Sequence, residues 1–278
     1  MPQFTYGFRI YAVLIKNKNV LQEHIFLVLN IMIPKVIHLS WKTKNFWNSQ
    51  NPLFLNGMKN LKEQNLDYIV QVSDDNDVND YIQSCISNED WLLIKDKHIV
   101  EKTDLWRLLK IYHEGGIYCD IDRFVNIPLR EIISPQDRCI LPIHQWIDFS
   151  QDLIIAEKGM PHIKRAIDLN IQRRKEGCKD VLSLGPVSYF HAITETYIKK
   201  QYPRFLERKQ FQVVKDIIES NEGFRCFPEY PPKTILFDPE RGGWDRGNLG
   251  TRDDFYKECN TSHWTNDKTT MDKKMYGN

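Results

Sequence analysis

The sequence predicts an α/β fold in which a mostly parallel sheet is flanked by helices. Short β-rich runs alternate with longer helical runs over residues 33–199, and this alternation is typical of strands joined by crossover helices. The length of 278 residues suits one large domain or two smaller ones, with a core that needs no disulfide or metal. Ligands in such folds bind at the carboxyl ends of strands, so we expect functional residues directly after strands.

The first elements are a strand, a helix and a strand. Residues 33–41 are predicted to form a buried strand, because their centre is apolar and a proline opens the run. Residues 52–64 carry apolar side chains on one helical face, and residues 66–72 form a β-rich run. An acidic, turn-rich stretch over residues 73–80 leads into a second helix, predicted over about residues 78–85.

The helix predicted over residues 103–114 has the clearest pattern. Its apolar residues recur at i, i+3, i+4 and i+7 and make one stripe: Leu105, Leu108, Leu109 and Tyr112. Thr103 is the predicted N-cap. The glycine pair at 115 and 116 ends the helix, because glycine tolerates a left-handed backbone. A strand is predicted next, over residues 117–121.

The remaining elements follow the same alternation. Residues 138–143 and 153–156 are predicted strands, and residues 161–174 and 186–199 are predicted helices with a proline in the first turn. After residue 211, prolines and paired glycines favour loops that wrap the domain.

Composition excludes several classes of protein. Hydrophobic residues make up 41% and charged residues 27%, near the globular average, which excludes a disordered or collagen-like chain. There are 38 Lys and Arg against 37 Asp and Glu, so no overall field attracts nucleic acid, and we expect no nucleic-acid partner. The six cysteines include no C-x-x-C pair, which argues against structural zinc and favours reduced thiols in the cytoplasm.

Residues 1–32 differ from the rest of the chain. Two apolar runs, residues 11–15 and 25–33, flank a polar segment. The longer run is too short to cross a bilayer, which takes about 20 apolar residues. We therefore expect an extra segment of unassigned role, no transmembrane span and a cytoplasmic protein. The alternatives are a peripheral or weakly anchored membrane contact through this segment, or translation that starts at Met32.

Two carboxylates, Asp120 and Asp122, end the strand predicted over residues 117–121. Because side chains alternate on a strand, both share a face with Tyr118 and lie about 6–7 Å apart. The other face is apolar and enters the core: Ile117, Cys119 and Ile121. Two such carboxylates suit a hard divalent cation such as Mn²⁺ or Mg²⁺, which takes oxygen ligands. The alternative is a solvated strand end.

Context separates this pair from a second D-x-D in the chain. Asp75-Asn76-Asp77 lies in the acidic stretch and is interpreted as surface. An apolar strand leads into Asp120 instead, which places it at the end of a strand. Asp104 and Arg107 lie at i, i+3 off the apolar stripe of their helix, either as a surface ion pair or facing the same cleft. Arginine suits bidentate contact with phosphate or carboxylate, and aspartate suits sugar hydroxyls.

Together, residues 33–43 (IPKVIHLSWKT) and 103–122 (TDLWRLLKIYHEGGIYCDID) resemble the DXD-containing sugar-transferase family. This family includes yeast-type α-mannosyltransferases and bacterial capsular polysaccharide sugar transferases. The similarity covers about residues 34–128 and continues more loosely through residues 151–161 and 184–186.

The resemblance implies a single GT-A catalytic domain over residues 33–265. Its nucleotide-sugar-binding half, which is Rossmann-like, would span residues 33–128, and its acceptor half residues 129–265. Residues 1–32 would then be an extra segment and residues 266–278 a polar tail.

The implied activity is transfer of a hexose from a UDP- or GDP-linked sugar to a glycan or other hydroxyl acceptor, with retention of configuration. A Mn²⁺ or Mg²⁺ ion would bridge the acidic motif and the donor diphosphate as a Lewis acid. The expected partners are thus a nucleotide-sugar donor and a carbohydrate or glycoconjugate acceptor. Inverting transfer would instead need a carboxylate base, for which Asp148 and Asp152 are the candidates.

The resemblance also assigns roles to individual residues. Asp120 and Asp122 would hold the metal, and Asp120 would also contact the donor. Asp104 and Arg107 would contact the donor sugar. These four residues are the expected catalytic set.

Other residues receive roles by their position. Trp41 and Tyr118 are expected to contact the donor, with Trp41 near the base. His263, in a His-Trp pair near the C-terminus, is the implied third metal ligand, although the Ser-Trp that usually follows is absent. Arg123 either approaches the diphosphate or pairs with an acidic neighbour. His38 is interpreted as a packed core histidine.

Two other function classes fit part of this pattern. One is a metal-dependent phosphohydrolase, which should carry further His or Asp ligands at strand ends. The other is a non-catalytic nucleotide-sugar-binding domain.

Overall fold

The computed structural model describes residues 33–44, 59, 61–121, 124–125, 128–144, 148–228 and 236–237, all within the unit Ile33–Asn278. The predicted N-terminal segment and polar tail lie outside these residues. Most of the helix predicted over residues 52–64 also lies outside them, but residues 59 and 61–64 are helical.

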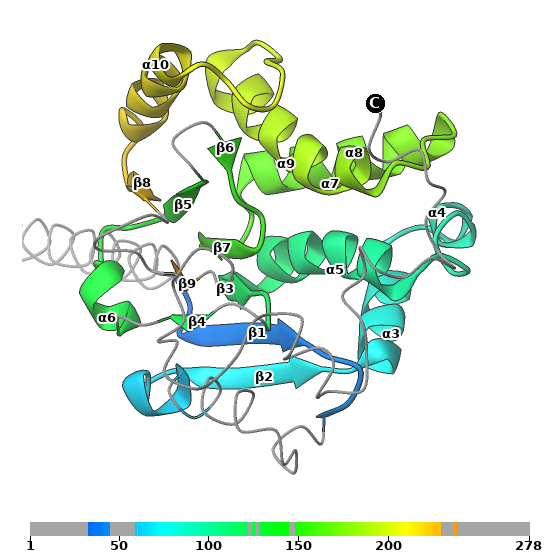
Figure 1. The fold of residues 1–278 in the computed structure, drawn as a ribbon. Coiled ribbons are helices and arrows are strands. Elements are labelled where there is room, and N and C mark those ends of the chain that lie inside the picture. Colours follow the sequence, from blue (N-terminus) through cyan, green and yellow to red (C-terminus); the bar gives the residue numbers. More distant parts are fainter. Residues whose placement is uncertain are drawn as a thin grey trace, which may run out of the picture. The chain divides into compact units, whose positions relative to one another are not determined.

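A seven-stranded sheet forms the centre of the unit (Figure 1). Its strands are β1 (Val36–Ser40), β2 (Ile69–Ser73), β3 (Gly116–Cys119), β5 (Cys139–His144), β6 (Asp148–Phe149), β7 (Leu153–Ala156) and β8 (Phe224–Pro228). β1 pairs in parallel with β2 and β3, and β5 with β8, whereas β7 is antiparallel to β3 and β5, and β6 is antiparallel to β5. Every strand except β6 and β7 therefore runs in one direction, which confirms the α/β fold with a mostly parallel sheet. A separate small sheet pairs β4 (Phe124–Val125) with β9 (Leu236–Phe237).

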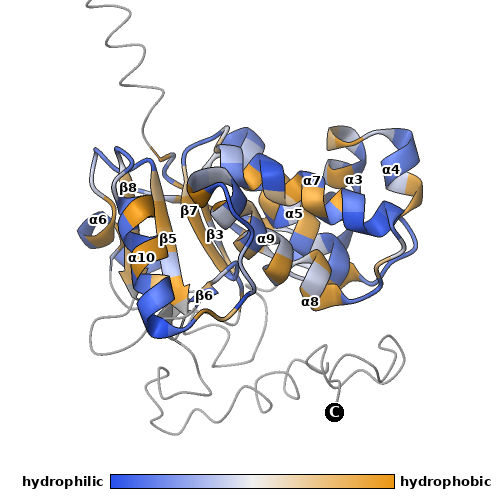
Figure 2. Ribbon diagram, turned by 90° about the horizontal axis from the view of Figure 1, so that it is seen from above, coloured by the Kyte–Doolittle hydropathy of each residue, from blue (hydrophilic) through white to orange (hydrophobic). Residues whose placement is uncertain are grey.

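Helices cover this sheet and account for most of the remaining described chain. They are α3 (Asp75–Cys85), α4 (Asn88–Leu92), α5 (Ile99–Glu114), α6 (Leu129–Ile132), α7 (Pro161–Lys175), α8 (Val181–Leu184), α9 (Pro186–Ile193), the π-helix η2 (Thr194–Ile198) and α10 (Arg208–Glu219). Helices α5, α7 and α9 lie side by side (Figure 2), each with hydrophobic residues between hydrophilic ones. None of the described helices is long and apolar enough to cross a membrane.

The two faces of the sheet belong to two hydrophobic cores. On β3, Ile117 and Cys119 enter one core together with residues of α6. Tyr118 points the other way, into the core shared with α5, α7 and α9, and is 1% exposed. The sequence pattern treated the Tyr118 face as the polar one. The structure corrects this, because helices cover both faces of β3 until the strand ends at Cys119.

Helix α5 starts four residues before its predicted N-cap. Its N-cap is His98, whose Nδ1 accepts a hydrogen bond from the Val100 amide. Thr103 lies inside the helix and donates its hydroxyl to the Ile99 carbonyl, so the prediction of a Thr103 cap was wrong. The predicted end is confirmed, since Gly115 caps the helix with φ of 70°.

The acidic stretch is not a turn but the start of a helix. α3 begins at Asp75, three residues before the predicted start, because Asp74 and Asp77 form a reciprocal capping box. Asp77 contacts Lys44 at the surface, which fits the interpretation of this D-x-D as surface.

The region after residue 211 contains a helix and a strand where only loops were predicted. α10 packs on the core through Phe211, Val214 and Ile218, and β8 pairs along its whole length with β5. Pro228 suggested a loop, because proline has no N–H to donate to a strand ladder. It is tolerated here because it occupies the last position of β8, where the ladder ends.

Candidate active site

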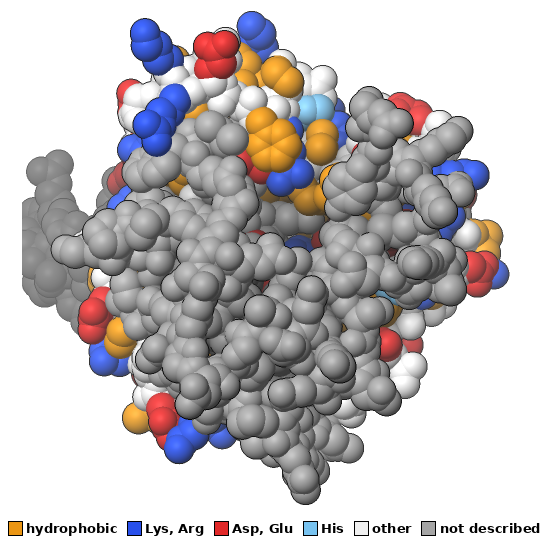
Figure 3. Space-filling view, viewed as in Figure 1, with side chains coloured by type: hydrophobic (Ala, Val, Ile, Leu, Met, Phe, Trp, Pro, Cys, Tyr) orange, Lys and Arg blue, Asp and Glu red, His pale blue; other side chains and the backbone are white. Residues whose placement is uncertain are grey.

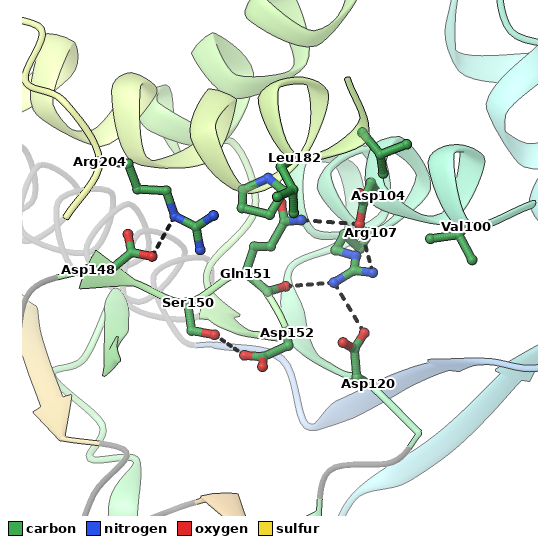
Figure 4. Close-up of a pocket in the computed structure, with 12 residues that line it drawn as sticks. Val100, Asp104, Arg107, Asp120, Asp148, Ser150, Gln151, Asp152, Leu182 and Arg204 are labelled. Carbon is green, nitrogen blue, oxygen red and sulfur yellow. Dashed lines mark hydrogen bonds and ion pairs between the residues drawn. The ribbon is translucent and has the colours of Figure 1, made fainter. Parts of the chain in front are cut away.

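A pocket of about 230 Å³ lies where β3 ends, between that strand end and the helices (Figure 4). Its polar lining comprises Asp104, Arg107, Asp120, Asp148, Ser150, Gln151, Asp152 and Arg204. Four of these side chains are acidic and two are basic, so the described lining favours cations. In Figure 3, acidic and basic side chains are visible near the centre of the face shown. The pocket lies at the carboxyl end of β3, which is where ligands are expected to bind in folds of this kind.

One wall of the pocket is built on α5. Asp104 and Arg107 lie one turn apart, and Arg107 Nη2 is 2.9 Å from Asp104 Oδ1. Both side chains are buried, which excludes the alternative of a surface ion pair. Gln151 Nε2 also donates to Asp104 Oδ1, at 3.1 Å. The carboxylate is therefore fixed from two sides.

Arg107 joins this wall to the end of β3. Its Nη1 is 3.1 Å from Asp120 Oδ1 and donates to the Gln151 carbonyl at 3.1 Å, while its Nε donates to the Thr103 carbonyl. Its guanidinium lies 4.5 Å from the centre of the Tyr118 ring. Burial by itself would lower the pKa of Arg107, but Asp120, Tyr118 and Asp104 outweigh it and raise that pKa, so the cation is permanent.

The carboxyl group of Asp104 depends on that cation for its charge. Burial raises the pKa of Asp104, and the charge of Arg107 opposes the rise. Gly185 comes so close that a Cβ there would collide with Asp104 Oδ2 and lie 2.8 Å from Gln151 Nε2. Glycine is therefore required at position 185 because a side chain would displace the Asp104 carboxylate. The backbone does not require it, since a φ of −94° is open to other residues.

Asp120 directly follows β3 and is the part of this array that reaches the pocket. Its side chain is 30% exposed, its Oδ1 accepts the Tyr118 hydroxyl, and its amide donates to the Asp152 carbonyl at 2.8 Å. Burial raises the pKa of Tyr118 well above its usual value, which keeps that hydroxyl protonated as a donor. Tyr118 thus orients Asp120 from beneath. Asp122 lies outside the described residues.

The opposite wall comes from later parts of the chain. Asp148 on β6 is fully buried, and its Oδ2 lies 2.6 Å from Nε of Arg204, in the segment after η2. Asp148 Oδ1 accepts the Phe149 amide at 2.8 Å. Asp152 accepts the Ser150 hydroxyl. Sequence reasoning named Asp148 and Asp152 but missed Arg204, because no periodicity or motif marks the segment after residue 200.

Other predicted site residues lie away from this pocket or outside the description. Trp41 is half-buried just after β1 and does not line the pocket. His38 is buried, with Nε2 3.0 Å from the Gly115 carbonyl oxygen, and burial lowers its pKa, which fits a core histidine. Arg123 and His263 lie outside the described residues. Within the described ranges, no group of three or more His, Cys, Asp or Glu side chains is arranged to hold a metal.

A protein-family model matches the part of the chain that supplies the α5 wall of the pocket and Asp120. Residues 51–140 match the family model described as "Glycosyltransferase sugar-binding region containing DXD motif", and this span contains Asp104, Arg107 and Asp120. Among solved structures the chain is similar to "PaToxG Glycosyltransferase", with 18% sequence identity and a TM-score of 0.48 over 76% of this chain and 87% of that chain. No curated protein sequence matches the chain significantly. Residues 51–140 thus match the DXD-motif sugar-binding region of glycosyltransferases, and this match supports glycosyltransferase activity.

Proposed function

We propose that the chain transfers a hexose from a UDP- or GDP-linked donor to a hydroxyl of a glycan or glycoconjugate, with Mn²⁺ or Mg²⁺ and with retention of configuration. The observation that carries this proposal is the array of Asp104, Arg107 and Asp120, joined by ion pairs of 2.9 and 3.1 Å at the bottom of an acidic pocket. Such an array holds its groups in place before the substrate arrives, as catalysis by positioned charges requires.

The chemistry of the lining fits a hard divalent cation. Asp120 offers a partly exposed carboxylate at a strand end, and the described lining carries more acidic than basic side chains. Asp120 and its neighbour in sequence, Asp122, would hold the ion. When bound, the cation neutralises charge that develops on the departing nucleoside diphosphate.

The chain's own residues would orient the donor sugar and keep water out. The Asp104 carboxylate is held by the side-chain amide of Gln151, and the backbone carbonyl of Gln151 is held by Arg107. Asp104 thus presents a hydrogen-bond acceptor and Gln151 an amide in fixed positions, which suits hydrogen bonds to sugar hydroxyls. Apolar Val181, Leu182 and Pro186 complete the lining, and a pocket closed by such groups disfavours hydrolysis of the donor. We assign this part of the pocket to the donor sugar, although its lining draws on both predicted halves of the domain.

The state of the acceptor-side carboxylates supports retention. Both oxygens of Asp148 are engaged, one by Arg204 and one by the Phe149 amide. Asp152 accepts the Ser150 hydroxyl. A base for inverting transfer must accept a proton from the acceptor hydroxyl, and a carboxylate held by arginine has a reduced affinity for that proton.

A donor screen with matched variants tests the proposal. Nucleotide release is measured for UDP- and GDP-hexoses with Mn²⁺, with Mg²⁺ and with EDTA. We expect one donor to be turned over only with metal, and Asp120→Asn to lower the rate about 100-fold or more. Asp75→Asn is the matched control from the other D-x-D, and its rate should stay within about twofold of wild type. Metal-independent turnover, or an Asp120→Asn rate like wild type, would contradict the proposal.

A further inference from the structure

Arg204 differs from Arg107 in having donors to spare. Within the described ranges its one hydrogen-bond partner is Asp148, bound through Nε at 2.6 Å. Its two terminal nitrogens point into the pocket in Figure 4. Because Asp148 balances the charge of Arg204, the pair offers hydrogen-bond donors without a net charge.

Phe205, the next residue, has a backbone conformation that its side chain disfavours. Its φ is 63°, in the left-handed region where a bulky residue costs about 1–2 kcal/mol. Lys199 shares this conformation but caps the end of η2, where it is common. Phe205 ends no helix. Residues with strained backbone conformations cluster at functional sites, so the conformation of Phe205 suggests a functional role for this residue.

The strained conformation exposes an aromatic ring beside Arg204, which lines the pocket. Phe205 is 56% exposed although its neighbour Leu206 is buried, and its ring centre lies 4.6 Å from Cζ of Arg204. One face of the ring is thus covered by the guanidinium, and the side chain otherwise faces solvent. The left-handed turn lets Leu206 anchor the segment while Phe205 stays outside.

We infer that Phe205 and Arg204 form the acceptor subsite and that the acceptor is a carbohydrate. This inference rests on the glycosyltransferase function proposed above. A pyranose has an apolar face of C–H groups and an edge of hydroxyls, which match an exposed aromatic face and free guanidinium N–H groups respectively. Asp120 lies on the opposite side of the pocket from Arg204, with Gln151 between them (Figure 4), so donor and acceptor sugars would meet at Gln151. The acidic excess of the lining disfavours an anionic acceptor.

Steady-state kinetics with saccharides test the inference. Nucleotide release from the preferred donor is measured alone and with maltotriose, lactose or mannobiose, beside serine- and tyrosine-containing peptides. We expect at least one saccharide to accelerate release and to be recovered with an added hexose. Phe205→Gly should raise the KM for that saccharide about tenfold or more and move the donor KM by a smaller factor. Phe205→Tyr, which keeps the ring, should restore the saccharide KM.

Thermal unfolding separates a binding role from a structural one. Phe205→Gly removes the disfavoured conformation, so we expect its Tm to equal or exceed that of wild type even as acceptor binding weakens. Val213→Ala, which truncates an exposed apolar residue of α10, is the control and should leave the saccharide KM within about twofold.

Each adverse result has a distinct meaning. A wild-type chain that turns over no nucleotide sugar contradicts the proposed function, and the acceptor inference with it. Turnover that peptides but no saccharide accelerate overturns the inference and leaves the proposed function standing. An unchanged saccharide KM in Phe205→Gly overturns it as well.

Discussion

The two arginines of the pocket occupy opposite walls and differ in how much of their bonding capacity the protein uses. Arg107 is 7% exposed and contacts two carboxylates and two backbone carbonyls. Arg204 is 20% exposed and pairs with one carboxylate. Every nitrogen of Arg107 has a partner within the protein, whereas the terminal nitrogens of Arg204 face the pocket. The first arginine therefore positions carboxylates, whereas the second has N–H donors available for a ligand.

The comparison bears on how arginines in acidic pockets are interpreted. Arginine at a site suggests direct contact with phosphate or carboxylate of the substrate. Burial changes that expectation, because breaking a buried network to admit a ligand would leave Asp104 and Asp120 without their counter-charge. We propose that Arg107 acts through the aspartates it holds, and that Arg204 acts on the substrate directly.

The largest expected effect comes from removing each arginine in turn. Arg107→Ala leaves two carboxylates uncompensated, so we expect a loss of about 3–5 kcal/mol in the free energy of unfolding. Arg204→Ala removes the counter-charge of one carboxylate, Asp148, which keeps its hydrogen bond from the Phe149 amide. We expect this variant to lose about 1–3 kcal/mol in the free energy of unfolding. Urea unfolding of both variants measures the difference. Equal losses would remove the distinction between the two walls.

A smaller effect should follow from moving Asp104 without removing any charge. The Cβ of Gly185→Ala would displace the Asp104 carboxylate and Gln151. A shift of about 1 Å in a catalytic array can cost about 100-fold in rate, so we expect nucleotide release to fall about 10- to 100-fold in a folded protein.

Gly159→Ala is the matched control for this substitution. Gly159 has φ of 80°, and a Cβ at this position would meet nothing within 4 Å, so alanine there should cost about 1–2 kcal/mol of stability without changing the rate. A Gly185→Ala enzyme as active as the Gly159→Ala enzyme would show that the position of Asp104 tolerates displacement.

Acidification should affect the scaffold behind both walls. Burial lowers the pKa of His162 from 6.5 to about 3. The unfolded chain therefore takes up a proton below pH 6.5 that the folded chain does not. The free energy of unfolding is therefore unaffected by His162 above pH 6.5. It is reduced by about 2 kcal/mol at pH 5 and continues to fall toward pH 3.

The variant His162→Asn tests this effect on the scaffold. It removes the titrating group but keeps a polar atom near the Tyr197 hydroxyl, to which His162 Nδ1 is bonded at 2.8 Å. Its unfolding free energy should vary less between pH 7 and pH 5 than that of wild type, although its value at pH 7 is lower. An identical pH slope in both proteins would assign the acid sensitivity elsewhere. The pH dependence of activity in the variant then reports on the pocket carboxylates.

Prediction from sequence succeeded where a signal is local. β7 was predicted at its observed bounds, and α7 within one residue at its C-terminal end, because an apolar run and an N-terminal proline mark them directly. Gly115 ended α5 as expected. The start of α5 was misplaced, since Thr103 has the chemistry of an N-cap but bonds to Ile99 within the helix instead. β8 was missed because five residues ending in proline become a strand only beside β5.

The candidate site was predictable in part for the same reason. Asp120 could be placed after an apolar strand, and Asp104 and Arg107 on one helical face. An i, i+3 pair has the same spacing whether it is exposed or buried, so the burial that makes Arg107 a positioning group had no signature in the sequence. Arg204 is 84 residues beyond Asp120 in the chain, and no motif links the two.

The sequence alone determined the alternation of strands and helices, the strand end that carries Asp120, and the resemblance to a glycosyltransferase family. These features depend on hydrophobic period, glycine and proline, and a short motif, all of which act over a few residues. Only the tertiary structure decided that Arg107 is enclosed by its aspartates, that β6 and the segment after η2 bring Asp148 and Arg204 to the opposite wall, and that Phe205 stands exposed beside them. Those outcomes depend on packing between segments that are far apart in the chain, because this packing decides which side chains are buried and which stay exposed to water.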